Sequence, residues 1–380
     1  MSSVEKVIED DAGEPGGNGE VVPGSLARFS YSVGKLIGIV ADAAYAGARG
    51  LREGVAVHYL RYAQEGIIFC SKKIVEPALP PERYEKLAGF KEETIGSAKH
   101  KLALWHKKAE KQAEDKPVYV VFHGVGGHWA DVGVFPDEKD ADGMSRHYRQ
   151  EWLQAMAKTG AEVIAPHMSG QGRSQPHRTR QGESYFKQDI GLVADYLQEH
   201  KIPLNRVVIV GESMGGALAT MLSAEMTSRG HPPAVLGLIN SFSSLLDCVC
   251  EYLQESESYR HIDRAAVQRI LKHPLDSAGR LQELDPKATR LYLAHSIEDE
   301  RINFDHRRRL YQAGKARGLG ISTRTIKDDF ELPGATWHHI GWNPAKITED
   351  LEASYHRQRA RRTNGTANGH NNGNGNGVGR

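Results

Sequence analysis

The sequence predicts an α/β domain in which a mostly parallel β-sheet is covered by helices on both faces. The predicted strands are short apolar runs, at 118–122, 162–166, 206–210, 235–239 and 290–294. Helical stretches alternate with these runs, at 145–159, 185–200, 214–228 and 305–317. Because strands and helices alternate at the spacing of βαβ units, the strands should run parallel. The run at 118–122 is apolar throughout, as expected for a strand that is buried on both faces, and the other runs are similar.

Further strands are predicted at both ends of this alternation. Residues 90–95 and 102–105 have the pattern of a hairpin around a polar turn at 96–100. Residues 322–327 are expected to form the last strand, after the helix predicted at 305–317. The predicted sheet therefore begins near residue 90 and ends near residue 327.

The charge balance argues against nucleic acid as a partner. The 380 residues include 49 Lys and Arg and 48 Asp and Glu, a formal net charge of +1, whereas nucleic-acid-binding domains carry a basic excess. A locally basic run at 356–362 is interpreted as a solvated helix end, with contact to acidic lipid or nucleic acid as the alternative. Cys70, Cys248 and Cys250 lack the spacing of a disulfide framework. They predict a reducing compartment, and hence a cytoplasmic protein.

Neither a metal nor a cofactor is predicted. Cys248 and Cys250 lack the second Cys or His pair that a zinc site needs at finger-like spacing, and are expected to pack as small apolar residues. The glycine clusters at 124–127 and 211–216 match neither the dinucleotide-binding pattern G-x-G-x-x-G nor the phosphate loop G-x-x-x-x-G-K-[ST]. Nucleotide cofactors are therefore not expected.

Both ends of the chain are expected to be disordered. Glycine and polar residues dominate residues 1–24 and 358–380, which leaves too little apolar surface to offset the entropy lost on folding. Residues 25–78 are expected to form a helical segment with no preceding secretory signal. Its most apolar part, 36–51, is interrupted by charged residues and is too short to span a membrane. It is expected to pack on the domain, with weak peripheral membrane association through residues 25–75 as the alternative.

The sequence GESMGG at 211–216 directly follows a predicted strand and opens a predicted helix. This is the G-x-S-x-G pattern of a nucleophile elbow, a strained turn that exposes the serine hydroxyl. Its small neighbours, Gly211, Gly215 and Gly216, would let the strand and the helix approach closely. The helix N-terminus would favour developing negative charge. We therefore expect Ser213 to be a nucleophile; the alternative is a glycine-rich turn without a chemical role.

The carboxylate that would assist Ser213 is expected later in the chain. A serine hydroxyl needs a histidine to remove its proton and an acidic residue to orient that histidine. In the expected order of Ser, acid and His, Asp299 follows the strand run at 290–294 and is the predicted acid. Glu298 and Asp305 are the alternative acids. If none of the three carboxylates has a catalytic role, the segment is an exposed acidic loop.

The histidine that would act as the base is predicted in the loop after the last strand. The sequence there is WHHIGW at 337–342, which offers two adjacent candidates. A triad histidine belongs on such a loop. His338 is the preferred base, and His339 is the alternative. The other histidines are expected to be surface or packing residues.

A hole for the oxyanion of acyl transfer is predicted from two backbone N–H groups. The sequence HGVGG follows the first apolar strand run, in the loop from which one donor is expected. Val125 would supply that donor, and Met214, next to the nucleophile, would supply the other. Gly124, Gly126 and Gly127 permit the close backbone approach that such a hole needs.

With these motifs in this order, residues 79–357 resemble the α/β-hydrolase superfamily. The layout from PALPPERYEKLAGF to the HGVGG turn is similar to the branch of membrane-associated esterases and protein depalmitoylases, where a helical anchor precedes the domain. Members often carry D-x-x-G-x-G-x-S after the fourth strand, and here His167 replaces the aspartate. The resemblance implies an α/β-hydrolase fold with a small cap of short helices at about 243–286.

The function predicted from these residues and this resemblance is hydrolysis of carboxylic esters or thioesters through an acyl-enzyme intermediate, in enzyme class EC 3.1. The substrate would be a small-molecule or lipid acyl ester, or an acylated protein. Acyl transfer to another acceptor and peptide cleavage use the same triad and remain alternatives. A non-catalytic α/β-hydrolase fold that serves as a binding or membrane-associated scaffold is the alternative from a different class.

Overall fold

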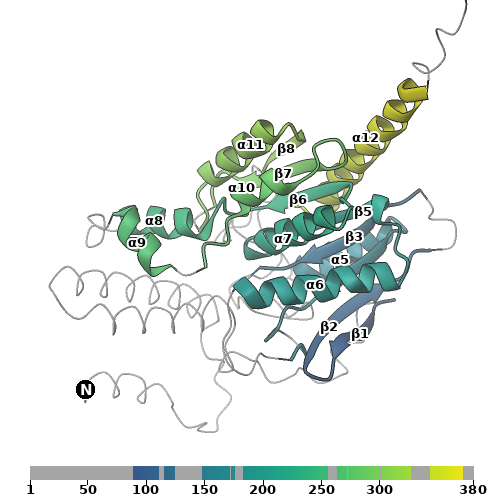
Figure 1. Cartoon of the computed structure of the whole chain (residues 1–380), viewed down its shortest axis with the longest axis horizontal. Helices are drawn as coiled ribbons and strands as arrows, with labels where there is room; N and C mark the ends of the chain where they lie inside the picture. The colour runs from purple at the N-terminus through teal and green to yellow at the C-terminus, as the bar shows by residue number, and fades with distance from the viewer. Residues whose placement is uncertain are drawn as a thin grey trace, which may run out of the picture.

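Figure 1 shows a computed structural model of the chain, in which a β-sheet lies between layers of helices. The structure describes residues 89–110, 115–124, 148–171, 173–175, 183–255, 263–271, 273–299, 301–326 and 343–370. The strands are β1 (Lys91–Ser97), β2 (His100–Lys107), β3 (Val118–Phe122), β4 (Glu162–Pro166), β5 (Val207–Glu212), β6 (Val235–Ile239), β7 (Arg290–Ser296) and β8 (Gly320–Ile326). Their order in this eight-stranded sheet is β1-β2-β4-β3-β5-β6-β7-β8.

The direction and order of the strands place a site at one edge of the sheet. β3 to β8 run parallel, and β1 and β2 join them as an antiparallel hairpin. The chain order reverses at β3, because β4 lies on one side of it and β5 on the other. In open α/β sheets such a reversal leaves a crevice at the carboxyl ends of the strands, where ligands bind. The loops after β3 and β5 border this crevice.

Helices cover both faces of the sheet. The described helices are α5 (Tyr148–Lys158), α6 (Glu183–Glu199), α7 (Met214–Ser228), α8 (Leu245–Glu255), α9 (Arg264–Ile270), α10 (Ser277–Arg280), α11 (Asp305–Arg317) and α12 (Pro344–His370), with short 3-10 helices at Leu204–Arg206 and Leu281–Glu283. Of these, α8 and α9 lie to the side of the sheet (Figure 1). Leu197 of α6, Leu218 of α7 and Leu310 of α11 belong to an apolar core on one face. Trp152 of α5 and Tyr355 of α12 belong to the core on the other. Every residue of β3, β5 and β6 is buried between these layers, which explains why all but Glu212 at the end of β5 are uncharged and nearly all are apolar.

The fold class predicted from the sequence is confirmed. β3, β4, β6, α7 and α11 have the predicted bounds. Other ends shift by a few residues: β5 begins at Val207, because the preceding residues form a 3-10 turn, and β8 begins at Gly320. Between β6 and β7 the chain forms α8, α9 and α10, in the region predicted to hold short cap helices.

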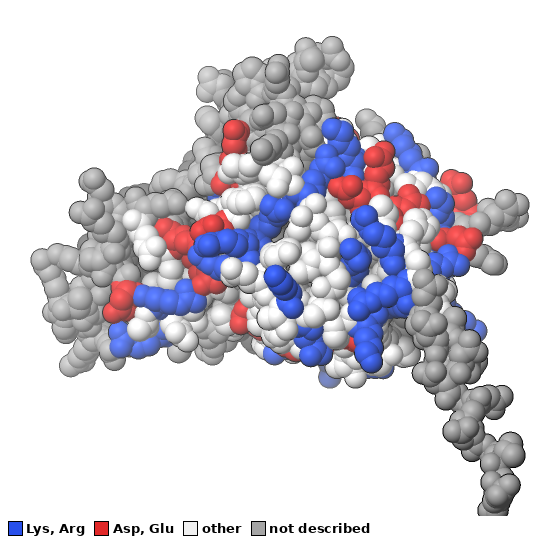
Figure 2. All heavy atoms as spheres, turned by 90° about the horizontal axis from the view of Figure 1, so that it is seen from above, with Lys and Arg blue, Asp and Glu red and all other residues white. Residues whose placement is uncertain are grey.

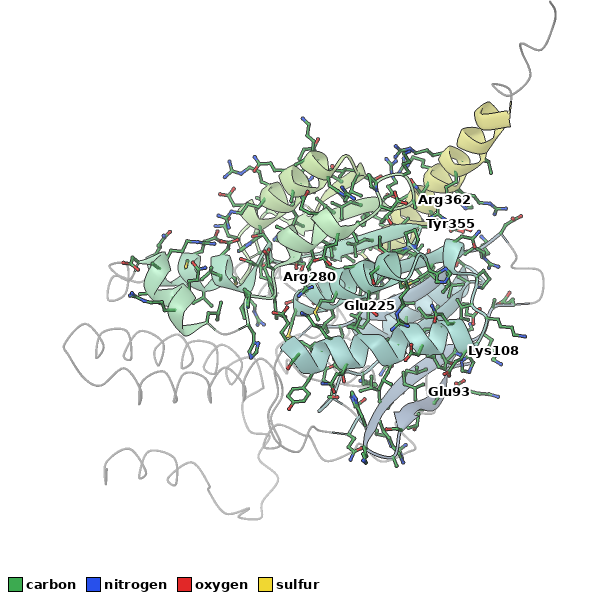
Figure 3. The ribbon with its side chains drawn as sticks, in the orientation of Figure 1. Glu93, Lys108, Glu225, Arg280, Tyr355 and Arg362 are labelled. Atoms are coloured by element: carbon green, nitrogen blue, oxygen red, sulfur yellow. The ribbon has the colours of Figure 1, made fainter. Side chains whose placement is uncertain are left out.

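The helix α12 continues through residues 358–370, where composition predicts disorder, so that boundary is corrected. Arg362 donates to the carbonyl oxygens of Asn205 at 3.1 Å and Ala288 at 2.5 Å. Figure 3 shows Arg362 and Tyr355 on the part of α12 that lies beside the sheet. The basic run in this helix is therefore only partly solvated. Composition cannot predict this anchoring, because the carbonyl acceptors come from distant loops.

Both predicted N-terminal segments, 1–24 and 25–78, lie outside the described residues, as does 371–380. The apolar run at 36–51 belongs to this part of the chain. Within the ranges that the structure describes, no helix combines the length and the apolarity needed to cross a lipid bilayer.

Candidate active site

Ser213 lies in the turn between β5 and α7, at the carboxyl end of a central strand. Its backbone has φ 55° and ψ −124°, a conformation that residues with a side chain rarely adopt. Its N–H donates to Ile239 O at 2.9 Å, and Ser241 Oγ donates to Ser213 O at 2.8 Å. Contacts from the end of β6 and the residues after it thus hold the nucleophile candidate in a strained turn.

Three glycines make room for this turn. A Cβ at Gly211 would lie 2.0 Å from the carbonyl oxygen of Gly215, and a Cβ at Gly215 would lie 2.3 Å from the carbonyl oxygen of Phe122. A Cβ at Gly216 would lie 2.1 Å from Ser241 Oγ. Each of these distances is far shorter than a van der Waals contact. Close packing of β5, α7 and β3 therefore requires the motif glycines.

Gly215→Ala is expected to destabilise the protein by about 3 kcal/mol, because the added methyl group would overlap carbonyl oxygens of a buried strand. Gly191→Ala is the matched control, since it also changes a helical glycine and its Cβ would have no neighbouring atom nearer than 3.9 Å. That change should be neutral or stabilise by about 0.5–1 kcal/mol. Thermal unfolding followed by circular dichroism measures both effects. Equal unfolding temperatures would contradict the packing described for α7.

Gly124 follows β3 and lies against Ser213. A Cβ at Gly124 would be 3.2 Å from Ser213 Cβ and 3.6 Å from Ser213 Oγ. The contact follows from the sheet order, because β3 and β5 are neighbours and their carboxyl ends meet at the same edge. The ring nitrogen Nδ1 of His123 lies 2.8 Å from Gly124 O and helps to fix this turn. The HGVGG loop and the GESMGG turn are thus adjacent at their described ends.

Met214 is the first residue of α7 and is buried. The first N–H groups of a helix have no carbonyl partner within that helix. They also carry the positive end of the helix dipole. The amino end of α7, directly behind Ser213, is therefore a favourable place for negative charge that develops next to the serine.

Asp299 follows β7, and its carboxylate is buried. Its Oδ1 accepts hydrogen bonds from the N–H groups of Arg301 and Ile302, both at 2.9 Å. The two alternative carboxylates are more solvated: Glu298 is exposed, and the side chain of Asp305 is 51% exposed. A buried carboxylate of fixed orientation is little screened by water, so Asp299 is the better suited of the three to hold a histidine.

His295, at the end of β7, is one of the histidines expected to be surface or packing residues, and the structure shows that it fixes the Asp299 turn. Its Nε2 is 2.8 Å from Ile302 O, so Nε2 carries the proton and donates to that carbonyl. The same nitrogen is 3.5 Å from Asp299 Oδ2. His295 therefore holds both the carboxylate and the residue whose N–H binds it. The sequence places His295 four residues before Asp299, but nothing in it indicates the contact with Ile302 O.

The loop after β6 connects the ends of β5 and β7. Asn240 has a positive φ of 44° and donates its N–H to Ala294 O at 2.9 Å. Its Oδ1 accepts the N–H of Ser296 at 2.8 Å. Together with the bond from Ser213 to Ile239, these contacts join the ends of β5, β6 and β7. The turns that carry Ser213 and Asp299 therefore stand on the same edge of the sheet.

The predicted site residues outside the described part of the chain are Val125, Gly126, Gly127, His338 and His339.

Comparison with known protein families matches residues 117–265 to the alpha/beta hydrolase fold family. The chain has the α/β-hydrolase fold. The matched region contains Gly124 and Ser213, and Asp299 lies after it. Comparison with curated protein sequences finds no match to this chain.

Three solved structures that are similar to this chain share little sequence with it. An alpha-beta hydrolase from Vibrio vulnificus has a TM-score of 0.55 at 14% identity, covering 79% of this chain and 93% of that one. An esterase from Pyrococcus furiosus has a TM-score of 0.50 at 14% identity, covering 73% and 93%. An acylaminoacyl peptidase from Pyrococcus horikoshii has a TM-score of 0.45 at 19% identity, covering 74% of this chain but only 43% of that one. At these identities the likeness concerns the fold alone.

A second group of serine, histidine and carboxylate side chains stabilises the loop after β4 of the α/β-hydrolase fold. Ser169 donates through Oγ to Asp189 Oδ1 at 2.7 Å and through its N–H to Asp189 Oδ2 at 2.8 Å. His100 Nε2 lies 2.6 Å from Asp189 Oδ1. This nitrogen therefore donates to the carboxylate and cannot accept a proton from Ser169. The group holds the loop in which His167 replaces the motif aspartate.

A third such group links α8 to α11. Ser243 donates its N–H to His306 Nδ1 at 3.1 Å and its hydroxyl to Asp247 Oδ2 at 2.9 Å. His306 Nε2 lies 3.1 Å from Glu251 Oε2. Ser243 and His306 are both fully buried, so an ester could not reach this serine. The group anchors α8 on the body of the α/β-hydrolase fold.

The carboxylates of this third group are held in their charged form. Burial alone would raise the pKa of Asp247, but hydrogen bonds from two serines and the guanidinium of Arg264 hold the pKa below its ordinary value. Burial also opposes the ionisation of Glu251, and His306 and Arg309 outweigh it and lower that pKa. α8 is therefore fastened to α9 and α11 by ion pairs.

Proposed function

We propose that this protein is a serine hydrolase that cleaves carboxylic esters or thioesters through an acyl-enzyme intermediate. The observation that carries the proposal is Ser213, held in a strained turn between β5 and α7 with Gly124 against its side chain. A serine so placed at a topological switch point has its hydroxyl at the edge of the sheet where ligands bind. The buried Asp299 on the same edge supplies the carboxylate that such chemistry needs.

In the proposed reaction, Ser213 Oγ attacks the acyl carbonyl carbon while His338 takes the hydroxyl proton. The N–H groups of Val125 and Met214 bind the oxyanion, and Asp299 orients the imidazole and stabilises its positive charge. The bond from the acyl carbon to the leaving oxygen or sulfur then breaks, and the leaving group takes the proton from the histidine. Water attacks the acyl-enzyme with the same histidine as the base, which releases the acid and restores Ser213.

Pre-steady-state hydrolysis of p-nitrophenyl esters tests this proposal. An acyl-enzyme whose breakdown is slower than its formation gives a burst of p-nitrophenol close to one equivalent per enzyme. A panel of acyl chain lengths and a palmitoyl thioester in parallel would define the substrate class, including the depalmitoylase activity that the branch resemblance suggests. An alcohol or amine acceptor in the assay separates hydrolysis from acyl transfer. A folded protein without turnover on any member of the panel would favour the non-catalytic scaffold instead.

His338→Ala is expected to lower ester turnover by about 10³-fold or more, because the serine loses its base. His339→Ala is the matched control, since it removes an identical side chain from the neighbouring position. Steady-state kinetics of both variants on the best p-nitrophenyl ester measure the effect. A large loss in His339→Ala with near-normal turnover in His338→Ala would assign the base to the second histidine.

A further inference from the structure

Three arginines meet at the amino end of β8, next to α12. Arg290 begins β7, and Arg357 and Arg361 lie one turn apart on α12. Arg290 Nε donates to Ser322 Oγ at 2.9 Å, and a terminal nitrogen of Arg357 lies 3.5 Å from the same oxygen. Terminal nitrogens of Arg290 and Arg361 lie 3.0 and 3.5 Å from the position that a Cβ of Gly320 would occupy. The guanidinium groups therefore converge on one spot at the surface.

No carboxylate neutralises this cluster within the described part of the chain. Neighbouring arginines are paired, Arg324 with Asp350 at 3.0 Å and Arg359 with Asp115 at 2.6 Å. The contacts of Arg290, Arg357 and Arg361 are instead to the neutral oxygens of Ile321, Ser322 and Pro286. Figure 2 shows several Lys and Arg side chains, with Asp and Glu side chains among them, on the face that is seen from above.

The three positive charges of the cluster repel one another. The pKa of Arg290 is lowered, first by burial and then by the charges of Arg357 and Arg361. An anion bound between the three groups would relieve this repulsion, and guanidinium groups match the oxygens of phosphate in pairs. The Ser322 hydroxyl accepts from Arg290, so its own proton is available to donate to such an anion.

We infer that Arg290, Arg357, Arg361 and the Ser322 hydroxyl form a binding site for a phosphate or diphosphate group. The convergence of three unneutralised guanidinium groups beside Ser322 and Gly320 carries this inference. The site lies at the amino ends of β7 and β8, whereas Ser213 follows the carboxyl end of β5. In a parallel sheet these ends lie on opposite edges, so the anion site is separate from the proposed acyl site and independent of the proposed function.

The same chemistry could be offered by a soluble phosphorylated molecule or by a phospholipid headgroup, and the test separates the two sources. Isothermal titration of the full chain with inorganic pyrophosphate, at ionic strength held constant with NaCl, measures the soluble form. Co-sedimentation with phosphatidylcholine vesicles, with and without phosphatidic acid, measures the headgroup. Binding to pyrophosphate alone assigns a soluble ligand, binding only to the phosphatidic acid vesicles assigns a headgroup, and binding to both supports the shared chemistry.

The double variant Arg357→Gln with Arg361→Gln is expected to weaken whichever binding is seen by about tenfold or more, because two charge-assisted contacts are lost. Both side chains are exposed, so the fold should persist, and circular dichroism checks this. Arg359→Gln is the matched control, an arginine of the same helix already paired with Asp115, and should bind as the wild type does. Absence of binding to both probes, unchanged binding in the double variant, or an equal loss in Arg359→Gln would overturn the inference.

Discussion

Ser213→Ala is expected to lower ester turnover by about 10⁴-fold or more, because the proposed acyl-enzyme forms on this hydroxyl. The strained turn should persist, since Ser241 and Ile239 hold it through main-chain atoms of residue 213. Circular dichroism should therefore show an unchanged fold. Steady-state kinetics on the best p-nitrophenyl ester measure the loss.

Ser169→Ala is the matched control for Ser213→Ala. It removes a buried serine that also lies beside a histidine and a carboxylate, but whose hydroxyl donates directly to Asp189. Turnover per folded molecule should stay within a few-fold of the wild type, although thermal stability should fall because Asp189 loses one donor. Wild-type turnover in Ser213→Ala, or its loss in Ser169→Ala alone, would place the chemistry elsewhere.

Asp299→Asn is expected to lower kcat by about 10⁴-fold, because the proposed mechanism then loses the charge that orients and stabilises the imidazole. The amide oxygen of Asn can still accept the N–H groups of Arg301 and Ile302, so the turn should remain formed. The substitution therefore isolates the charge from the structure of the loop. The ratio of kcat values, with KM measured separately, gives the result.

Asp305→Asn and Glu298→Gln are the controls for Asp299→Asn, because both remove the charge of a nearby carboxylate that is more solvated. Neither should lower kcat more than a few-fold. An active Asp299→Asn protein together with an inactive control would transfer the acidic role to that residue.

The sheet could be predicted because its strands carry a strong local signal. β3 and β6 are continuous apolar runs, and β4 is apolar after Glu162; burial on both faces imposes this pattern. The end of α12 could not be predicted in this way. Its composition is polar, and what holds it is the contact of Arg362 with carbonyl oxygens of Asn205 and Ala288, far away in the sequence.

The motifs of the candidate site could be predicted from the sequence. The physical basis for choosing between similar residues could not. The pattern G-x-S-x-G and the strand before it make Ser213 the candidate nucleophile from the sequence alone. The preference for Asp299 over Glu298 gains its physical basis only from burial and from two backbone donors. The role of His295 depends on a contact with Ile302 O, which no composition or spacing specifies.

The cluster of Arg290, Arg357 and Arg361 on the surface also could not be predicted from the sequence. The sequence predicts a basic helix end at 356–362 but does not indicate which of its arginines are neutralised. Only the fold reveals that Arg359 faces Asp115, whereas Arg357 and Arg361 face a third arginine from β7. Formal charge balance over the whole chain therefore conceals a local site of one sign.

The central claim, that Ser213 is the nucleophile, is tested most directly by locating a covalent adduct. The full-length protein is treated with a fluorophosphonate, digested and examined by peptide mass spectrometry. The proposed function predicts one phosphonylated site, on Ser213 in the peptide that contains GESMGG, and none in the Ser213→Ala variant. An adduct on a different residue, or equal labelling of wild type and Ser213→Ala, would contradict the claim.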